Sequence, residues 1–299
     1  MSPSAESADF RPRVPQIPGR PLDVAWIHGS VSSKHNTDPD IQVHRYDEHS
    51  VILRQNMAID YEAPFLYLLF GDARAVLLDT GATQSAGFFP LRTTIDDLMD
   101  EWLALHPRDD YELEVLHTHS HDDHVAGDGQ LVGRPATTVV PASRAEAYDY
   151  LQLTADLDQL ARLDLGVRVL DCIAGPGHDD AAVTFYDSLT GWLLTGDTVY
   201  PGRLYVRDWP AYVATLDRLV AFAETHPVSQ VLGCHIETTT TPGVDYPVRT
   251  VYQPDETPLE MSVEQLRDVR RAAHEIGDRP GRYVYPDFVI QHLGTDSYG

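Results

Sequence analysis

The chain has 299 residues, of which 42% are hydrophobic and 23% charged, and its 46 acidic residues against 22 basic ones give a formal net charge of −24. This is the composition of an ordinary soluble globular protein with a substantial core. The negative charge argues against nucleic acid or a membrane as a partner, because phosphates would be repelled and the chain has no basic run. Two cysteines are too few for a disulfide framework.

No stretch of the sequence has the apolar length of a signal peptide, or the roughly 18 apolar residues that a membrane-spanning helix needs. We therefore expect a cytoplasmic protein. Residues 1–21 are polar and rich in proline, which predicts an extended N-terminal arm. Residues 22–299 are expected to form a single domain, because no linker rich in glycine and serine divides them.

The pattern of apolar residues predicts strands and helices that alternate along the chain. In chain order the predicted segments are two strands within 64–81, a helix at 93–106, strands at 111–118 and 137–142, a helix from Ser143, strands at 167–171, 181–187 and 191–196, a helix at 208–226, a strand at 229–237 and a helix at 262–276. Capping residues mark the helix starts at Thr94 with Asp97, at Asp208 and at Ser262. Two β-rich halves with helices outside predict an α/β protein, a four-layer αββα sandwich.

Four of the 14 histidines fall within residues 116–127, "LHTHSHDDHVAG". Imidazole is the commonest metal ligand, and a loop that leaves a strand can present several side chains at once. Two registers are open. If His117 and His119 lead, Asp122 stands three residues after the second histidine; if His119 and His121 lead, the string reads HxHxDH. Either register predicts a metal site in this loop.

The second register resembles the hallmark of the metallo-β-lactamase-fold superfamily. The other landmarks of that superfamily follow in the same order: His178 in "PGH", Asp197 in "GD" and His235 near the end of a later strand. The earlier segment Asp79-Thr80-Gly81 resembles the one that supports the site in this superfamily. The resemblance covers residues 64–237 and implies that Asp197 faces metal.

The resemblance implies a catalytic centre with two metal ions. Three histidines would hold the first ion, an aspartate and two histidines the second, and one aspartate would bridge both. In that order the ligands are His119, His121 and His178; Asp123, His124 and His235; and Asp197. Such a set leaves positions open for a bridging hydroxide and for substrate. Two zinc ions are the default expectation, with iron or manganese as alternatives, because His/Asp ligands do not select sharply.

Several neighbours of these ligands receive other roles. Asp79 is expected to hold the metal loop through hydrogen bonds. We favour His117 as a buried residue at a strand end over a supporting hydrogen-bond donor, and we expect Asp122 at the surface. Cys234 precedes His235 on a predicted strand, so it should point to the opposite face and is not interpreted as a ligand.

The family resemblance leaves the reaction open, because the superfamily hydrolyses lactams, thioesters, lactones, phosphodiesters and sulfate esters, and some members perform redox chemistry. The acidic chain argues against an RNA substrate. We expect a hydrolase of a carboxylic ester, lactone or thioester, similar to glyoxalase II and lactonases, that acts by attack of a metal-bridging hydroxide on a small molecule. The alternatives are an iron persulfide dioxygenase, a β-lactam hydrolase, or a binding protein with one structural zinc.

Tyr200 lies three residues after Asp197, a spacing that resembles lactonases in which a tyrosine polarises the substrate carbonyl. Packing under the metal loop is an equally open reading. Asp123 and Tyr200 are the expected catalytic residues. The candidates for holding the substrate, in particular a carboxylate, are Tyr200, Arg203, Tyr205 and Arg249. The segment after His235 is expected to form a loop over the site, and a homodimer is left open.

Overall fold

The computed structural model of the chain describes residues 20–294, so only Arg20 and Pro21 of the predicted arm lie within the described part. These two residues are exposed, whereas the next one, Leu22, is buried in the core. The carbonyl oxygen of Arg20 accepts a hydrogen bond of 3.0 Å from Nε2 of Gln230. The described end of the arm is thus attached to the second of two sheets. Among the described helices, none has the length and apolar character that crossing a membrane requires.

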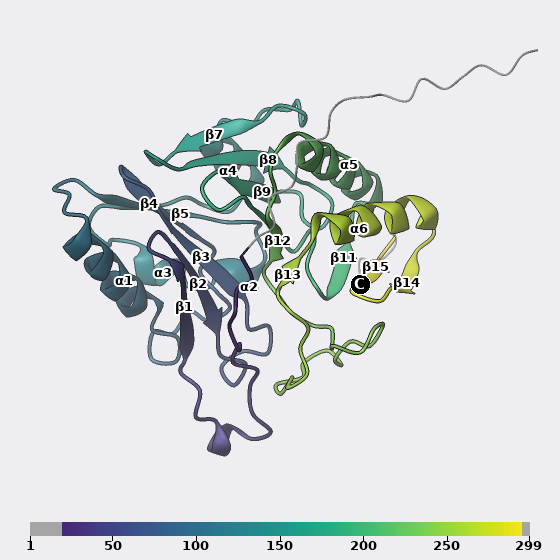
Figure 1. Cartoon of the computed structure of the whole chain (residues 1–299), viewed down its shortest axis with the longest axis horizontal. Helices are drawn as coiled ribbons and strands as arrows, with labels where there is room; N and C mark the ends of the chain where they lie inside the picture. Colours follow the sequence, from purple (N-terminus) through teal and green to yellow (C-terminus); the bar gives the residue numbers. More distant parts are fainter. Residues whose placement is uncertain (1–19, 295–299) are drawn as a thin grey trace, which may run out of the picture.

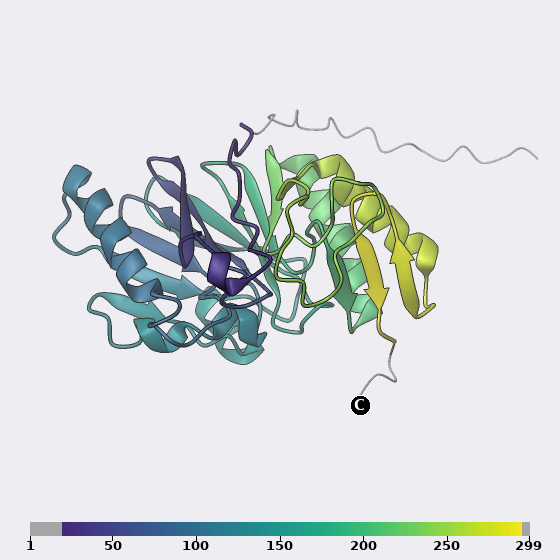
Figure 2. The ribbon, with the colours of Figure 1, turned by 90° about the horizontal axis from the view of Figure 1, so that it is seen from below.

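Two six-stranded sheets face each other, with helices on both outer faces (Figures 1 and 2). In spatial order the first sheet contains β1 (Ile41–Asp47), β2 (Ser50–Gln55), β3 (Phe65–Phe70), β4 (Arg74–Leu78), β5 (Glu112–Leu116) and β6 (Thr137–Val139). The second contains β13 (Glu260–Met261), β12 (Gln230–Gly233), β10 (Trp192–Gly196), β9 (Val183–Asp187), β8 (Val169–Ala174) and β7 (Ala161–Asp164).

Helices cover the outer face of each sheet. The helices are α1 (Leu91–Leu105), α2 (Asp122–Val125), α3 (Asp128–Leu131), α4 (Arg144–Leu151), α5 (Trp209–Thr225) and α6 (Val263–Ile276), with a short 3₁₀ turn η1 (Ser33–His35). Figure 1 shows α1 and α3 beside the first sheet and α5 and α6 beside the second. This is the predicted four-layer αββα arrangement, which is confirmed.

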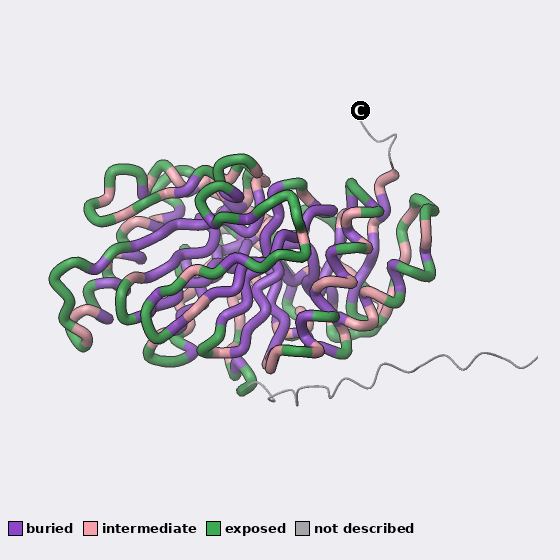
Figure 3. Tube along the Cα trace, turned by 90° about the horizontal axis from the view of Figure 1, so that it is seen from above, coloured by how far each residue is buried: buried purple, intermediate pink, exposed green. Residues whose placement is uncertain are grey.

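The central strands are apolar on both faces because each face packs against another layer of the fold. In β3, Phe65, Tyr67 and Leu69 pack between the two sheets, while the alternate residues Leu66 and Leu68 pack beneath α1. Successive side chains of a strand point to opposite faces, so a strand between two layers buries both sets. Figure 3 shows the consequence, with buried strands through the centre of the molecule and exposed segments around them.

The predicted helix starts are confirmed in three cases and wrong in one. Ser143, Asp208 and Ser262 each accept a hydrogen bond from the first turn of the helix that follows. α1 instead begins at Leu91, after Pro90, and no side chain caps it. Thr94 donates its hydroxyl to the carbonyl oxygen of Pro90 at 3.0 Å, so it lies inside the helix. The helix starts early because Leu91 is itself buried in the core.

A third, three-stranded sheet was not predicted from the sequence. It consists of β11 (Arg203–Val206), β15 (Val289–His292) and β14 (Gly281–Val284), in that spatial order. The hairpin of β1 and β2 was also not predicted. The small sheet packs beside α6 in Figure 1, and Leu204 and Ile290 belong to the same apolar cluster as α5 and α6. It matters for function because β11 lies between Asp197 and α5 in the chain.

Each large sheet contains a parallel strand pair whose carboxyl ends meet at one edge. In the first sheet β4 pairs with β5, and in the second β10 pairs with β12. Asp79 follows β4, the histidine loop follows β5, Asp197 follows β10 and His235 lies two residues beyond β12. In α/β sheets, ligands bind outside the carboxyl ends of parallel strands. The fold therefore brings the landmarks of the sequence to one place between the sheets.

Candidate metal centre

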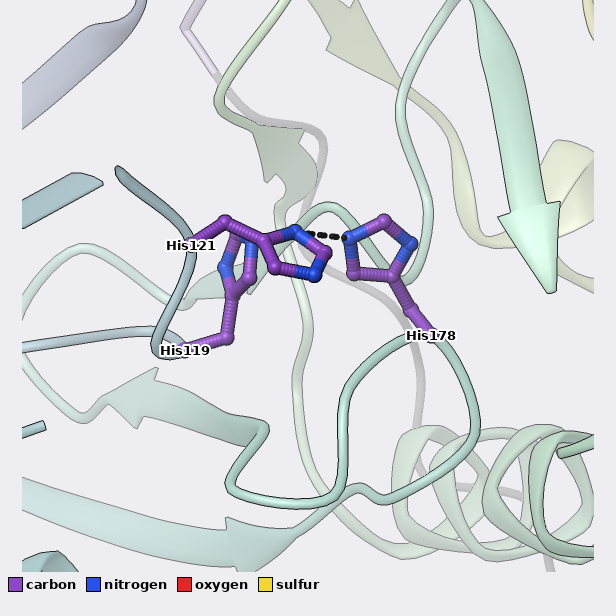
Figure 4. A group of neighbouring side chains, drawn as sticks. All are labelled: His119, His121 and His178. Carbon is purple, nitrogen blue, oxygen red and sulfur yellow. Dashed lines mark hydrogen bonds between the residues drawn. The ribbon is translucent and has the colours of Figure 1, made fainter. Parts of the chain in front are cut away.

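Three imidazoles from two loops converge at the first of two ligand groups. Nε2 of His119 lies 3.0 Å from Nδ1 of His121, and Nε2 of His178 lies 3.1 Å from that same Nδ1 atom. Figure 4 shows the three rings turned toward one another, His119 and His121 from the loop after β5 and His178 from the turn after β8. Imidazole nitrogens that meet at a single point form a ready ligand set for a transition metal.

The second ligand group contains two carboxylates and two imidazoles. Oδ2 of Asp123 lies 3.3 Å from Nε2 of His124 and 3.3 Å from Nε2 of His235. The two Nε2 atoms are 3.4 Å apart. Oδ1 of Asp197 completes the group, at 3.6 Å from His124 and 3.4 Å from His235. All four side chains offer one ligand atom to the same point.

Asp197 lies between the two groups and offers a different oxygen to each. Its Oδ2 atom lies 3.9 Å from His119 and 3.7 Å from His178, whereas Oδ1 faces the second group. Oδ1 is buried and has no hydrogen-bond partner among residues 20–294. A buried carboxylate oxygen without a partner is costly unless a cation meets it. The residues present therefore fit two cations that share this carboxylate.

The electrostatics of the two groups differ. Burial alone would raise the pKa of Asp197, but the charges of His235 and His124 outweigh it and hold that pKa below its usual range. Burial lowers the pKa of His235, whereas Asp197 and Asp123 raise it, to about 10 overall. In the first group, burial followed by the charge of His124 holds the pKa of His119 well below its ordinary value. His119 is therefore neutral, which is the form that binds metals.

Asp79 supports the histidine loop from beneath. It is fully buried, and its Oδ2 atom accepts hydrogen bonds from Nδ1 of His124 at 2.9 Å and from the hydroxyl of Thr118 at 2.8 Å. Its Oδ1 atom accepts the backbone N–H of Thr118 at 2.7 Å. The bond at Nδ1 orients the ring of His124 so that Nε2 faces the second group, where it can bind an ion once it has lost its proton.

Two more candidate ligands are oriented by backbone carbonyls. Nδ1 of His178 lies 2.7 Å from the carbonyl oxygen of Tyr205, and Nδ1 of His235 lies 2.9 Å from that of Glu62. Each ring then donates through Nδ1 and keeps Nε2 free to face its ligand group. Tyr205 contributes to the site through its backbone as well as its side chain.

Three neighbours of the candidate ligands, His117, Asp122 and Cys234, lie outside the two ligand groups. His117 is buried and bonds through Nε2 to Oδ1 of Asp128 at 2.9 Å, away from both ligand groups, and Asp122 is exposed. Cys234 was placed on a strand by the prediction, but β12 ends at Gly233. Strand alternation therefore does not govern its direction, and its thiol donates to Asp79 at 3.4 Å.

Tyr200, which lines the site, and Arg203 belong to one buried hydrogen-bond network. The hydroxyl of Tyr200 donates to the carbonyl oxygen of Arg203 at 2.5 Å and lies 3.1 Å from Oε2 of Glu237. The guanidinium of Arg203 pairs with Glu237, lies 3.4 Å from Asp245 and donates to the carbonyl oxygen of Tyr246 at 2.6 Å. The positive charge of Arg203 is thus neutralised within the protein.

A cleft of about 230 Å³ opens onto the ligand groups. Besides candidate ligands, its wall contains Glu62, Tyr200, Tyr205, Arg207, Glu237 and Leu293. Four of these residues were not predicted from the sequence: Glu62, Arg207, Glu237 and Leu293. Only Glu237 had a local signal, its position two residues after a candidate ligand. Arg249 lies beside Tyr61 and is not part of the cleft wall.

A family model of the metallo-beta-lactamase superfamily matches residues 62–275. The chain belongs to this superfamily. Among solved structures, it is similar to the DIM-1 metallo-beta-lactamase, with a TM-score of 0.54 and 12% identity over 81% of this chain and 100% of the other. It is also similar to TMB-1, with a TM-score of 0.51 and 15% identity over 80% and 99% of the two chains. At these identities the similarity shows the fold alone.

Curated proteins give a second set of similarities. The chain is 35% identical over 117 residues to a hydroxyacylglutathione hydrolase of Pseudomonas savastanoi pv. phaseolicola (strain 1448A / Race 6), covering 35% of this chain and 40% of that protein. It is 30% identical over 167 residues to a hydroxyacylglutathione hydrolase of Pseudomonas fluorescens (strain SBW25), covering 52% and 58%. The chain thus spans about half the length of these relatives.

Proposed function

We propose that the chain is a dinuclear metal-dependent hydrolase that cleaves a carboxylic ester, lactone or thioester of a small molecule. The observation that carries the proposal is the position of Asp197, whose two oxygens face two separate ligand groups. A structural metal site would be closed by four protein ligands around one ion. Two groups joined by one carboxylate, beside a cleft, fit a catalytic centre better.

In this proposal His119, His121 and His178 would hold one ion, Asp123, His124 and His235 would hold the other, and Asp197 would be shared by both. Zinc is the default metal, with iron or manganese as alternatives. When bound, the two ions would supply an activated water near neutral pH and positive charge for the substrate carbonyl oxygen.

Other residues of the chain orient the candidate ligands and the attacking water. Asp79 fixes the orientation of His124, and the carbonyls of Tyr205 and Glu62 fix those of His178 and His235. Asp123 lines the cleft in addition to its place in the second ligand group, so its carboxylate can accept a hydrogen bond from the attacking water. Preorganised groups of this kind lower the barrier because they need not reorient during the reaction.

The catalytic role expected for Tyr200 stays a prediction. Its side chain lines the cleft, but its hydroxyl donates to the carbonyl oxygen of Arg203. Polarising a substrate carbonyl would require exchange of that hydrogen bond. The expected substrate-holding role of Arg203 is harder to reconcile with its ion pairs to Glu237 and Asp245, because a neutralised guanidinium has little charge left to offer.

Similarity to proteins named hydroxyacylglutathione hydrolase supports a thioester among the three candidate bonds. The decisive experiment is elemental analysis of the protein purified without chelator, followed by assays on S-acyl glutathiones, acyl lactones, aryl esters and a cephalosporin. We expect two transition-metal ions per chain and turnover of a thioester or lactone.

Each alternative gives a different result in the same experiment. One iron per chain with oxygen consumption on a persulfide, and no hydrolysis, would replace the proposal with a dioxygenase. Turnover of the cephalosporin alone would indicate a β-lactam hydrolase. One tightly held zinc without any turnover would indicate a structural site.

A further inference from the structure

Arg207 is held beside the candidate metal centre by its backbone. It follows β11 and precedes Asp208, the residue that caps α5. The backbone N–H groups of Arg207 and Asp208 both donate to the carbonyl oxygen of Gly177, at 3.1 and 3.0 Å. Gly177 immediately precedes His178, one of the three imidazoles of the first ligand group. The base of the Arg207 side chain is therefore fixed relative to the ligand group.

The turn at Gly177 cannot easily shift. Its φ angle is +142°, and a Cβ atom there would lie 2.4 Å from Cα of Tyr212 on α5. Only glycine allows this close packing between the turn and the helix. The backbones of Arg207 and His178 are thus held by the same tightly packed turn, while the long side chain of Arg207 remains free to move its guanidinium.

The guanidinium of Arg207 is available for a ligand. Arg207 is exposed, lines the cleft and makes no side-chain hydrogen bond or ion pair within residues 20–294. Arg203, four residues earlier, is buried and neutralised by carboxylates. Within the described cleft wall, Arg207 is the one arginine.

Protein stability does not explain an arginine at this position. It lies next to the N-terminus of α5, where the helix dipole disfavours a positive charge. No carboxylate within the described residues pairs with it to offset that effect. In a chain of net charge −24, a lone arginine at the mouth of a reactive cleft provides a local site for an anion.

We propose that Arg207 is a specificity-determining residue that binds a carboxylate of the substrate while the scissile carbonyl lies at the metal centre. This inference rests on the proposed hydrolase function and narrows it to substrates that carry a carboxylate. A guanidinium presents a planar pair of N–H donors that matches a carboxylate.

A carboxylate fits the cleft better than a phosphate does. Glu62 lines the same cleft and forms no ion pair within the described residues, whereas Glu237 is paired with Arg203. An anion with two charges therefore meets more repulsion from Glu62 than an anion with one. The cleft volume of about 230 Å³ also limits the bound part of the substrate to a small group. Substrate binding would then depend on the attraction of its carboxylate to Arg207, which must exceed the repulsion from Glu62.

The test uses two pairs of thioesters that differ only in a carboxylate. The first pair is the acetyl thioesters of 3-mercaptopropionate and of 3-mercaptopropionamide, with the carboxylate on the leaving thiol. The second pair is the adipoyl and adipamoyl thioesters of a neutral thiol, with the carboxylate on the acyl side. Within each pair the chemical reactivity of the thioester is closely matched, so the ratio of the two kcat/KM values reports recognition of the carboxylate.

The wild type is compared with Arg207→Met and with Arg45→Met, all in the metal-loaded form. Arg45 is an exposed arginine on β1, so its replacement removes the same charge away from the cleft. We expect Arg207→Met to lower the anionic-to-neutral ratio by about 10- to 100-fold in one pair, the range of a charge-assisted hydrogen bond. Arg45→Met should leave the ratio within about twofold of the wild type. Metal content and melting temperature are measured for each variant.

A binding measurement separates this inference from the proposed function. Calorimetric titration with adipate and with adipamate, which replaces one carboxylate by an amide, does not depend on turnover. The wild type should prefer adipate by about tenfold, and Arg207→Met should lose that preference. Hydrolysis with an unchanged ratio in both pairs would overturn the role of Arg207 and leave the hydrolase intact. No hydrolysis of any thioester, lactone or ester by the wild type would count against the proposed function, and the titration would still decide whether Arg207 binds a carboxylate.

Discussion

Replacing Asp197 by asparagine should separate the metal centre from the fold. Asp197→Asn keeps the shape of the side chain and removes the negative charge that both ligand groups share. The oxygens of Asp197 lie between 3.4 and 3.9 Å from four imidazole Nε2 atoms. At about 3.5 Å and an effective dielectric constant of about 20, the attraction between this carboxylate and a cation of unit charge held among these nitrogens is roughly 5 kcal/mol. A loss of this size is enough to release an ion.

We expect Asp197→Asn to retain the ion of the three-histidine group and to lose the other. Turnover should fall by about three orders of magnitude or more, as when a metal-activated nucleophile is lost. Elemental analysis and kcat/KM on a thioester measure the two effects, and circular dichroism checks the fold. Asp122→Asn is the matched control, because it makes the same substitution at an exposed position of the same motif. Retention of both ions with near-normal activity in Asp197→Asn would refute the bridging role.

Three further variants test other parts of the structure. Asp79→Ala should weaken metal binding by about 10- to 100-fold, because it removes the hydrogen bond that orients the ligand His124. A competition titration with a chelator measures the metal affinity, and an unchanged affinity would contradict the prediction. Tyr200→Phe should lower kcat by up to about 100-fold at unchanged metal content, with the larger loss on oxygen esters, whereas a kinetically silent variant would leave only a packing role. Arg54→Met should destabilise the chain by about 3–5 kcal/mol, because Arg54 and Glu256 form a buried bidentate pair and the substitution leaves the carboxylate unpaired. Urea unfolding measures that loss against Arg45→Met, whose exposed pair should contribute about 1 kcal/mol or less.

The ligand groups could be predicted from the sequence because their signals are local. Four of the seven candidate ligands lie within six residues, and the others lie at or within four residues of the ends of apolar strands. Likewise, Asp208 and Ser262 cap helices through bonds that span three residues. Such contacts are set by the sequence nearby, so a pattern in one segment is enough to predict them.

The wall of the cleft could not be predicted because its contacts join distant segments. Arg203 was a candidate for substrate binding, but Glu237 and Asp245, 34 and 42 residues further along, neutralise it. The availability of Arg207 depends on the absence of such partners, which no local pattern reveals. The hairpin of β1 and β2 was missed for a different reason, since Glu48 and His49 at its turn are not residues that usually mark one.

The ligand groups draw their members from both halves of the sandwich, and this has a consequence for unfolding. His124 belongs to the loop after β5 and His235 lies beyond β12, about 110 residues later in the chain. An ion held by both would act as a cross-link between the sheets, in a protein whose two cysteines are both free. Closing a loop of this length lowers the entropy of the unfolded chain by an amount worth about 4–5 kcal/mol. Chelation should therefore loosen the docking of one sheet on the other, and hydrogen exchange should rise first along β3 and β12, where the two sheets meet at the Tyr67–Gly233 hydrogen bond.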